Sequence, residues 1–286
     1  MITLRKDGAE LDLLPEVGGA VSRFNIGGQD VLRRAPAGTT DVLQTGCFPL
    51  VPFANRIAFG RFAFAGETVQ LPRNFGEHPH ALHGQGWQSA WRVLSQSKGE
   101  AVLGFEHAAD SWPWDYEARQ GFALISDALR IELAVTNRSA RIMPISLGFH
   151  PYFPATPQTR LRAEVAGVWL SDDTCIPTER AGPAHFLDLA NGAAVADARL
   201  VDHCHFGWTR SLIVTQPELE RTLKLTASSD LDFLHCYIPQ HAGFFCVEPV
   251  SAMPDAFNRP AARGGWRSLA PGATLAVSMT LRARNH

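Results

Sequence analysis

Apolar and polar residues alternate with a period of two along much of the chain. The segments that show this alternation most clearly are residues 129–135, 161–165, 223–225 and 275–281. Such alternation is typical of a strand with one face in the core and the other in solvent. Almost no window carries apolar residues at the i, i+3, i+4 and i+7 spacing of an amphipathic helix. The pattern therefore predicts an all-β protein.

Two short turn sequences predict hairpins. Asp7-Gly8 lies between two alternating runs at the N-terminus, and Ala65-Gly66 lies between the runs that contain Phe62 and Val69. A glycine at the second turn position supplies the positive φ that a tight hairpin turn needs. Both regions should therefore fold as antiparallel strand pairs.

Glycine and proline punctuate the predicted strands along the whole chain, and no linker rich in Ser, Gly or charge divides it. We therefore expect residues 1–286 to form one large antiparallel β domain, a sandwich or a barrel. The longest stretch without clear alternation runs from about Gly182 to Gly207. Long loops in compact domains are usually functional or mobile, so this stretch is a candidate loop excursion.

Composition and net charge limit the kinds of molecule that the protein is expected to bind and the compartment in which it is expected to work. Apolar residues make up 45% of the chain and charged residues 19%, as in an ordinary globular protein. The formal net charge of -2 gives no electrostatic reason to bind nucleic acid or an anionic membrane. We see no secretory signal and no segment long enough to span a membrane. Five cysteines without a CxxC pair favour a reduced, cytoplasmic protein over a disulfide framework.

His150 is the first candidate for chemistry. It lies in an apolar heptapeptide, residues 147–153, directly before Pro151. A histidine transfers protons readily near neutral pH. The proline favours an extended backbone at His150 and cannot donate to a central sheet ladder, so we expect a strand to end here at the edge of a cleft. The alternative is a core histidine that packs between aromatic residues.

Glu248 is the second candidate. It closes the apolar run 243–247, and we expect Pro249 to end the strand there. A carboxylate at the edge of the core loses hydration, so its pKa rises and it becomes a usable base near neutral pH. A structural ion pair with Arg56 or Arg263 is the competing interpretation.

Three histidines, His78, His80 and His83, fall within six positions and first suggest a metal site. They do not match a recognised zinc spacing such as HExxH, so we expect no metal. Gly84 follows His83 and permits a tight turn and close approach of a ligand. Asp202 lies among apolar and aromatic residues, and taken alone it reads best as a turn-capping aspartate.

Five short motifs occur in one order along the chain: Asn55-Arg56-Ile57, Leu82-His83-Gly84, Gly148-Phe149-His150-Pro151-Tyr152-Phe153, Asp202-His203-Cys204 and Val247-Glu248-Pro249. The run Pro254-Asp255-Ala256-Phe257-Asn258 and the final Leu269-Ala270-Pro271-Gly272 follow them. In this order the set resembles the aldose 1-epimerase (galactose mutarotase) family. Each motif alone is weak, but the ordered set covers essentially the whole chain.

The resemblance implies a large β-sandwich with a sugar cleft that interconverts the α and β anomers of a free aldose. By position, Glu248 matches the family's general base and His150 its general acid. His83 matches a second active-site histidine, while Arg56 and Asp202 match residues that hold sugar hydroxyls. The partner would be a free aldohexose, and a monomer or weak homodimer is expected. The chain departs from the family pattern around His83, which leaves the preferred sugar open.

The chemistry agrees with these residue types. Mutarotation takes a proton from the C1 hydroxyl and gives one to the ring oxygen, so one base and one acid suffice and no cofactor is required. Three alternatives stay open. One is a hexose 6-phosphate mutarotase, with Arg73 and Arg259 as possible phosphate ligands. The others are a carbohydrate-binding module without catalysis and a cupin-like protein that binds metal through the three histidines.

Overall fold

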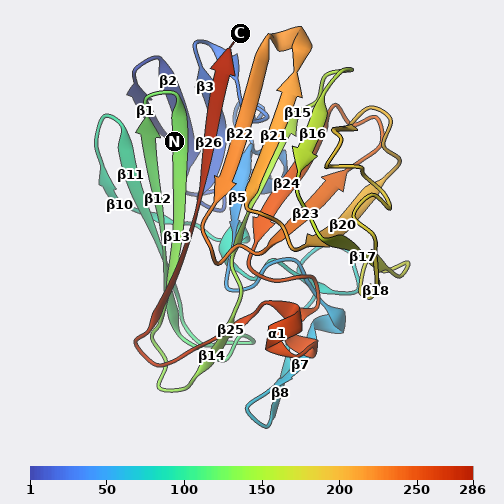
Figure 1. Ribbon diagram of the computed structural model, residues 1–286. Coiled ribbons are helices and arrows are strands. Elements are labelled where there is room, and N and C mark those ends of the chain that lie inside the picture. Colours follow the sequence, from blue (N-terminus) through green and yellow to red (C-terminus); the bar gives the residue numbers. More distant parts are fainter. Residues whose placement is uncertain (286) are drawn as a thin grey trace.

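Two large antiparallel sheets stack face to face in the computed structural model, which describes residues 1–285 (Figure 1). The first sheet has 11 strands. In spatial order they are β1 (Ile2–Lys6), β2 (Ala9–Leu14), β3 (Ala20–Ile26), β5 (Cys47–Leu50), β15 (Gly148–Pro154), β24 (Phe244–Val250), β23 (Phe233–Ile238), β20 (Val201–Phe206), β17 (Gly167–Ser171) and β18 (Pro177–Ala181), with β4 (Gln29–Asp30) paired to β3.

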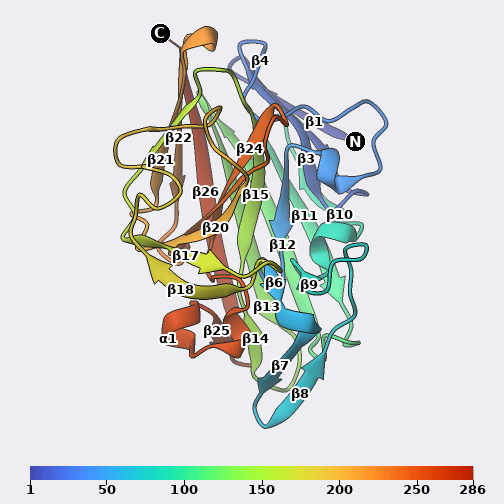
Figure 2. The ribbon, with the colours of Figure 1, turned by 90° about the vertical axis from the view of Figure 1, so that its right-hand side faces the viewer.

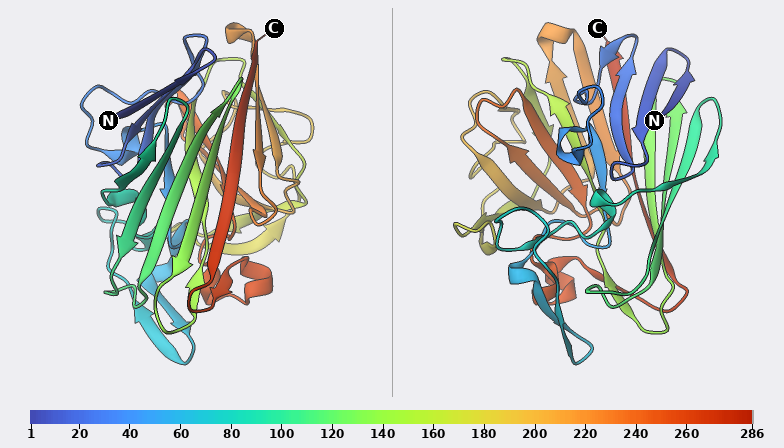
Figure 3. Two further views of the ribbon diagram at one scale, coloured as in Figure 1. Left: turned by 90° about the vertical axis from the view of Figure 1, so that its left-hand side faces the viewer. Right: turned by 180° about the vertical axis from the view of Figure 1, so that it is seen from behind.

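The second sheet has 9 strands. They are β10 (Arg92–Gln96), β11 (Glu100–His107), β12 (Tyr116–Ile125), β13 (Ala128–Asn137), β26 (Thr274–Asn285), β22 (Arg221–Ala227), β21 (Ser211–Gln216), β16 (Arg160–Ala163) and β19 (Ala193–Ala194). The left view of Figure 3 shows the long strands β13 and β26 side by side near its middle. The prediction of a large antiparallel β-sandwich is thus confirmed.

Short elements complete the fold. Three strand pairs stand apart from the sheets: β6 (Arg56–Ile57) with β9 (Ala81–Leu82), β7 (Arg61–Phe64) with β8 (Glu67–Gln70), and β14 (Met143–Ile145) with β25 (Arg267–Leu269). The helical elements are α1 (Ala261–Gly264) and the 3-10 turns η1 (Val42–Gln44), η2 (Ala58–Gly60), η3 (Gly86–Gln88), η4 (Pro217–Leu219) and η5 (Ala256–Asn258). No helix among residues 1–285 is long and apolar enough to cross a membrane.

Both predicted hairpins are present. Asp7 and Gly8 connect β1 to β2 with φ angles of 49° and 82°. Ala65 and Gly66 connect β7 to β8 with φ angles of 52° and 84°. Positive φ at both turn positions matches the twist of the flanking strands, which explains why a glycine stands second in each turn.

The main core lies between the two sheets, and the alternating residues of both point into it. The central strands of the first sheet are also covered on their other face. Phe149 and Phe153 of β15 point into the main core, whereas Tyr152 packs in a second apolar cluster on the opposite face. Burial on both faces explains why β15 and β24 are almost continuously apolar in sequence.

β15 lies in the middle of the first sheet, so the expectation that a strand would end at Pro151 is wrong. It pairs with β5 on one side and β24 on the other. The β15–β24 ladder keeps one register on both sides of a gap at residues 149–151. Pro151 and Pro249 lie in this gap on opposite strands and have no N–H to donate. Pro249 therefore interrupts the ladder without ending β24, which continues to Val250.

The expected loop from about Gly182 to Gly207 is only partly a loop. Its last part forms β20, which pairs with β17 and β23 inside the first sheet. The short strand β19 interrupts the rest and pairs with β16. The sequence of β20 shows no clear alternation because both faces of the strand carry polar residues. Asp202 is on one face, and His203 and His205 are on the other.

Candidate active site

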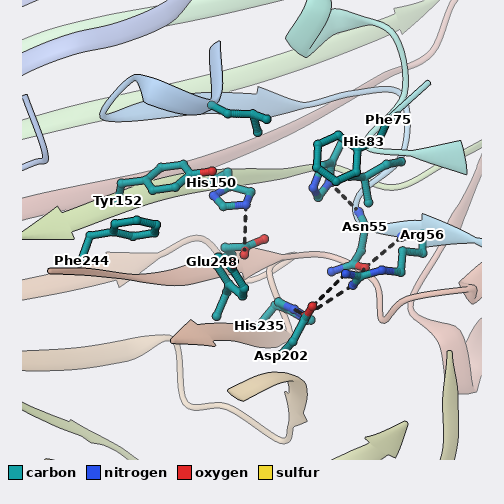
Figure 4. A pocket seen from close by; sticks show the side chains of 13 residues that line it. Asn55, Arg56, Phe75, His83, His150, Tyr152, Asp202, His235, Phe244 and Glu248 are labelled. Atoms are coloured by element: carbon teal, nitrogen blue, oxygen red, sulfur yellow. Dashed lines mark hydrogen bonds and ion pairs between the residues drawn. The ribbon is translucent and has the colours of Figure 1, made fainter. Parts of the chain in front are cut away.

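A pocket of about 280 Å³ opens on the face of the first sheet that points away from the main core. β15, β24, β23 and β20 carry one side of the pocket. The segment with β6 and β9, labelled in Figure 2, carries the other side. Figure 4 shows the side chains that converge there. The polar residues that line it are Asn55, Arg56, His83, His150, Asp202, His235 and Glu248. All five residues singled out from the sequence thus line one pocket.

Glu248 and His150 lie side by side on neighbouring strands (Figure 4). The register of β15 and β24 places them opposite each other, within the gap left by the two prolines. His150 Nε2 lies 3.3 Å from Glu248 Oε1. Both side chains are buried, and Glu248 Oε2 and His150 Nδ1 have no hydrogen-bond partner among the described residues. The two groups therefore form a contiguous acid–base pair with one carboxyl oxygen left unpaired.

Burial sets the protonation of this pair. Loss of hydration raises the pKa of Glu248 well above its ordinary value, and the carboxylate of Asp202 adds to the increase. Loss of hydration, reinforced by the His235 imidazole, lowers the pKa of His150 to about 3. Both pKa shifts favour the uncharged form of the side chain concerned. Near neutral pH we therefore expect the pair to hold one proton between Glu248 Oε1 and His150 Nε2.

His83 stands next to the pair, with its ring centroid 5.5 Å from that of His150. The backbone N–H of Asn55 donates to His83 Nδ1 over 3.0 Å. Burial and the neighbouring His150 lower the pKa of His83 well below its ordinary value, so the ring is neutral. Because Nδ1 accepts, the ring proton is on Nε2. His83 is thus set up as a hydrogen-bond donor.

Gly84 makes this placement of His83 feasible. His83 and Gly84 have φ angles of 58° and 74°. A Cβ atom on Gly84 would lie 2.2 Å from the carbonyl oxygen of Val51. Any other residue would therefore push the loop away from β5 and carry His83 with it.

Arg56 and Asp202 meet on the side of the pocket away from His150. Arg56 Nη2 donates to Asp202 Oδ2 over 2.8 Å and Arg56 Nη1 to Oδ1 over 3.3 Å. Burial by itself would raise the pKa of Asp202, but the hydrogen bond from His235 and the charge of Arg56 outweigh it and hold that pKa well below its usual range. Asp202 is therefore ionised and neutralises Arg56. It lies within β20, so the interpretation as a turn cap is wrong.

His235 is a polar pocket residue that the sequence did not reveal. It lies on β23 opposite Glu248 of β24, and its Nε2 is 2.7 Å from Asp202 Oδ1. In sequence it stands in the buried run Phe233-Leu234-His235-Cys236, where a lone histidine reads as core. His235 reaches the site because β23 pairs with β24 on one side and with β20 on the other, and β20 is three strands earlier in the chain.

The contacts of Glu248 and of the clustered histidines differ from two of the alternatives considered from the sequence. Glu248 is paired with His150 and not with Arg56 or Arg263. The three clustered histidines have separate contacts: His83 Nδ1 accepts from Asn55, His80 Nδ1 accepts from Phe59, and His78 faces Arg56. Within residues 1–285, no group of three or more His, Cys, Asp or Glu side chains is placed to hold a metal.

The fold and this pocket define a galactose mutarotase-like β-sandwich with a buried acid–base pair. The chain belongs to the aldose 1-epimerase family, because the family model for aldose 1-epimerase matches residues 1–282. The family resemblance seen in the sequence is thus confirmed.

Individual relatives support this assignment. The uncharacterized protein YphB of Escherichia coli (strain K12) is 34% identical over 247 residues, which is 84% of each chain. A crystal structure of a candidate aldose 1-epimerase from Escherichia coli K12 superposes with a TM-score of 0.93 at 31% identity, covering 99% of this chain and 98% of that one. A galactose 1-epimerase from Lactobacillus acidophilus NCFM shares the fold, with a TM-score of 0.81 at 16% identity and coverage of 99% and 93%.

Proposed function

We propose that this protein is a mutarotase, which interconverts the α and β anomers of a free aldose. The observation that carries this proposal is the 3.3 Å contact between His150 and Glu248 on one wall of the pocket. In a pyranose, the hydroxyl oxygen and the ring oxygen are both bonded to C1. A base and an acid that serve these two oxygens must therefore be neighbours, as Glu248 and His150 are.

The proton balance of the reaction matches this pair. With the shared proton on His150, the Glu248 carboxylate takes the proton of the C1 hydroxyl while the His150 imidazolium gives the shared proton to the ring oxygen, and the ring opens to the aldehyde. Rotation about the C1–C2 bond and reclosure with the two roles exchanged give the other anomer. The pair holds one proton before and after each step, so no net proton enters or leaves. General acid and general base catalysis each contribute about 10²–10⁴-fold.

The remaining polar side chains fit supporting roles in this proposal. His83 Nε2–H can stabilise negative charge that develops on the sugar oxygens. Arg56 and Asp202 present a donor and an acceptor and can hold sugar hydroxyls while they neutralise each other. Tyr152, Phe244 and Phe75 line the pocket and can pack on the apolar face of a pyranose.

Polarimetry tests the proposal directly. Freshly dissolved α-D-glucose and α-D-galactose should approach equilibrium rotation faster with the wild-type protein than in buffer. His150→Asn, purified and assayed in the same way, is the matched control. If the wild-type protein accelerates none of the free aldoses tried, the proposal is wrong.

The pH dependence of kcat/KM should reveal the buried pair. Loss of activity in acid requires a second proton on the pair, and the lowered pKa of His150, about 3, delays that step. We therefore expect kcat/KM at about pH 5 to stay within roughly twofold of its value at about pH 7, after subtraction of the uncatalysed rate. A fall with a midpoint at the ordinary histidine pKa of 6.5 would show that His150 titrates as an exposed imidazole.

Free sugars should be preferred to sugar phosphates. Arg56 is the only Lys or Arg among the described residues that lines the pocket, and Asp202 neutralises it. Arg73 is exposed and faces Glu77, and Arg259 donates to the carbonyl of Pro177, so neither expected phosphate ligand lines the pocket. We expect kcat/KM for glucose to exceed that for glucose 6-phosphate by about tenfold or more. The reverse preference in the same polarimetric assay would favour the phosphate-sugar alternative.

A further inference from the structure

One end of the pocket is apolar and is formed by Leu43, Tyr152 and Phe244. Arg33, which does not itself line the pocket, contacts all three. Its Nη2 donates to the carbonyl oxygens of Leu43 and, over 2.8 Å, of Thr45. The centre of its guanidinium lies 3.9 Å from the ring centroid of Tyr152 and 4.6 Å from that of Phe244. The Arg33 side chain thus contacts all three residues that form the apolar end of the pocket.

The same contacts lead to the acid–base pair. The backbone N–H of Arg33 donates to the carbonyl oxygen of Tyr152 over 2.8 Å. The Tyr152 ring stacks on the His150 ring, with centroids 4.7 Å apart and planes inclined by 14°. His150 in turn meets Glu248. Arg33, Tyr152, His150 and Glu248 therefore form a continuous series of contacts, the last three of which are visible in Figure 4.

Arg33 has an unusual environment for a cation. It forms no ion pair with a carboxylate among residues 1–285, and its Nε is buried without a partner. Burial lowers its pKa, although the side chain keeps its charge at any ordinary pH. The Arg33 side chain is partly buried, and a guanidinium withdrawn from water costs free energy unless it is paired. The guanidinium is thus held by two carbonyl oxygens and two aromatic rings, without a carboxylate partner among residues 1–285.

We infer that Arg33 is a positioning residue for the acid–base pair, and that it acts through Tyr152. This inference rests on the mutarotase function proposed above. Arg33 holds Tyr152 in place, and Tyr152 provides the flat surface that sets the orientation of the His150 ring toward Glu248. The aromatic wall that packs on the sugar and the acid that protonates it are then fixed by one side chain.

The charge of Arg33 acts on His150 in a definite direction. The groups that face His150 are Glu248 of β24, His235 of β23, Asp202 of β20, Arg56 of β6, His83 after β9, Cys47 of β5 and Tyr152 of its own strand. Asp202 favours a charged imidazole, whereas His235 and Arg33 oppose it. Removal of the Arg33 charge should therefore make His150 easier to protonate, and its pKa should rise.

Three variants test the inference. Arg33→Met removes the charge and both hydrogen bonds while keeping the length of the side chain, and we expect kcat/KM to fall about tenfold. Arg33→Lys keeps the charge but cannot bond two carbonyls and lie flat on a ring, so it should recover only part of the activity. Arg221→Met is the matched control. Arg221 is more deeply buried than Arg33, also bonds a backbone carbonyl, and lies outside the pocket, so its loss should affect stability and leave kcat/KM within about twofold of wild type.

A readout that is independent of activity separates positioning from a loss of packing. In protein with ¹⁵N-labelled histidine, the ring signals of His150 are assigned by their absence in His150→Asn. The midpoint of His150 protonation should move up by roughly one pH unit in Arg33→Met and stay in place in Arg221→Met. An unchanged midpoint together with wild-type kcat/KM in Arg33→Met would overturn the inference. If the wild-type protein shows no mutarotation but the midpoint moves, the proposed function fails while the coupling of Arg33 to His150 stands.

Discussion

Replacing Glu248 with glutamine should abolish catalysed mutarotation, with a fall in kcat of about 10³-fold or more. The carboxamide has nearly the shape of the carboxyl group but cannot take up the proton of the C1 hydroxyl. His150→Asn should have a similar effect, because it removes the group that protonates the ring oxygen. Polarimetry on the best free sugar measures both, and a variant that keeps more than about a tenth of wild-type kcat would contradict the assigned role.

The stability of Glu248→Gln separates lost chemistry from lost structure. Burial raises the pKa of Glu248 and so favours its neutral form, and Oε2 has no partner among the described residues. A neutral amide of the same size should therefore be accommodated. We expect the free energy of unfolding in urea to change by no more than about 1 kcal/mol. A much larger loss would mean that the fall in kcat reflects damage to the sheet.

Replacing Arg56 with methionine should have the second large effect. Arg56 and Asp202 are only 12% and 16% exposed, so the change leaves a buried carboxylate without its guanidinium. Breaking a buried ion pair in this way typically costs about 3–5 kcal/mol. Because Arg56 is also proposed to hold a sugar hydroxyl, KM should rise about tenfold or more. Urea unfolding and polarimetric kinetics measure the two effects separately.

The double variant Arg56→Met with Asp202→Asn distinguishes these two effects. Removal of both charges eliminates the uncompensated carboxylate, so most of the lost stability should return. The sugar-binding groups are still missing, so the high KM should persist. If the double variant recovers KM together with stability, Arg56 and Asp202 support the fold and do not contact the sugar.

The sequence predicted the candidate site better than it predicted its surroundings. Glu248, His150, His83, Arg56 and Asp202 were identified from motifs and all line one pocket. Each is a polar or charged residue within an apolar or turn-forming stretch, and this can be read from the amino-acid sequence alone. His235 and Arg33 are not visible in this way, because their roles depend on contacts between strands and loops that are distant in sequence.

The two prolines beside the pair show where a local rule failed. Pro151 and Pro249 were expected to end their strands, since neither can donate to a ladder. The sheet instead places them in the same short gap of the β15–β24 ladder, next to His150 and Glu248. One break in the ladder then accommodates both prolines. A rule applied to one strand at a time cannot anticipate this, because the compensation involves two strands about 100 residues apart.

The most direct test of the account is magnetisation exchange between the α and β anomeric protons of an equilibrated aldose, measured by ¹H NMR. At equilibrium no net reaction occurs, so transfer of saturation from one proton to the other reports only interconversion at C1. We predict transfer with the wild-type protein and none above buffer with Glu248→Gln. Equal transfer with both proteins, or none with the wild type for any free aldose, would contradict a mutarotase whose chemistry depends on Glu248 and His150.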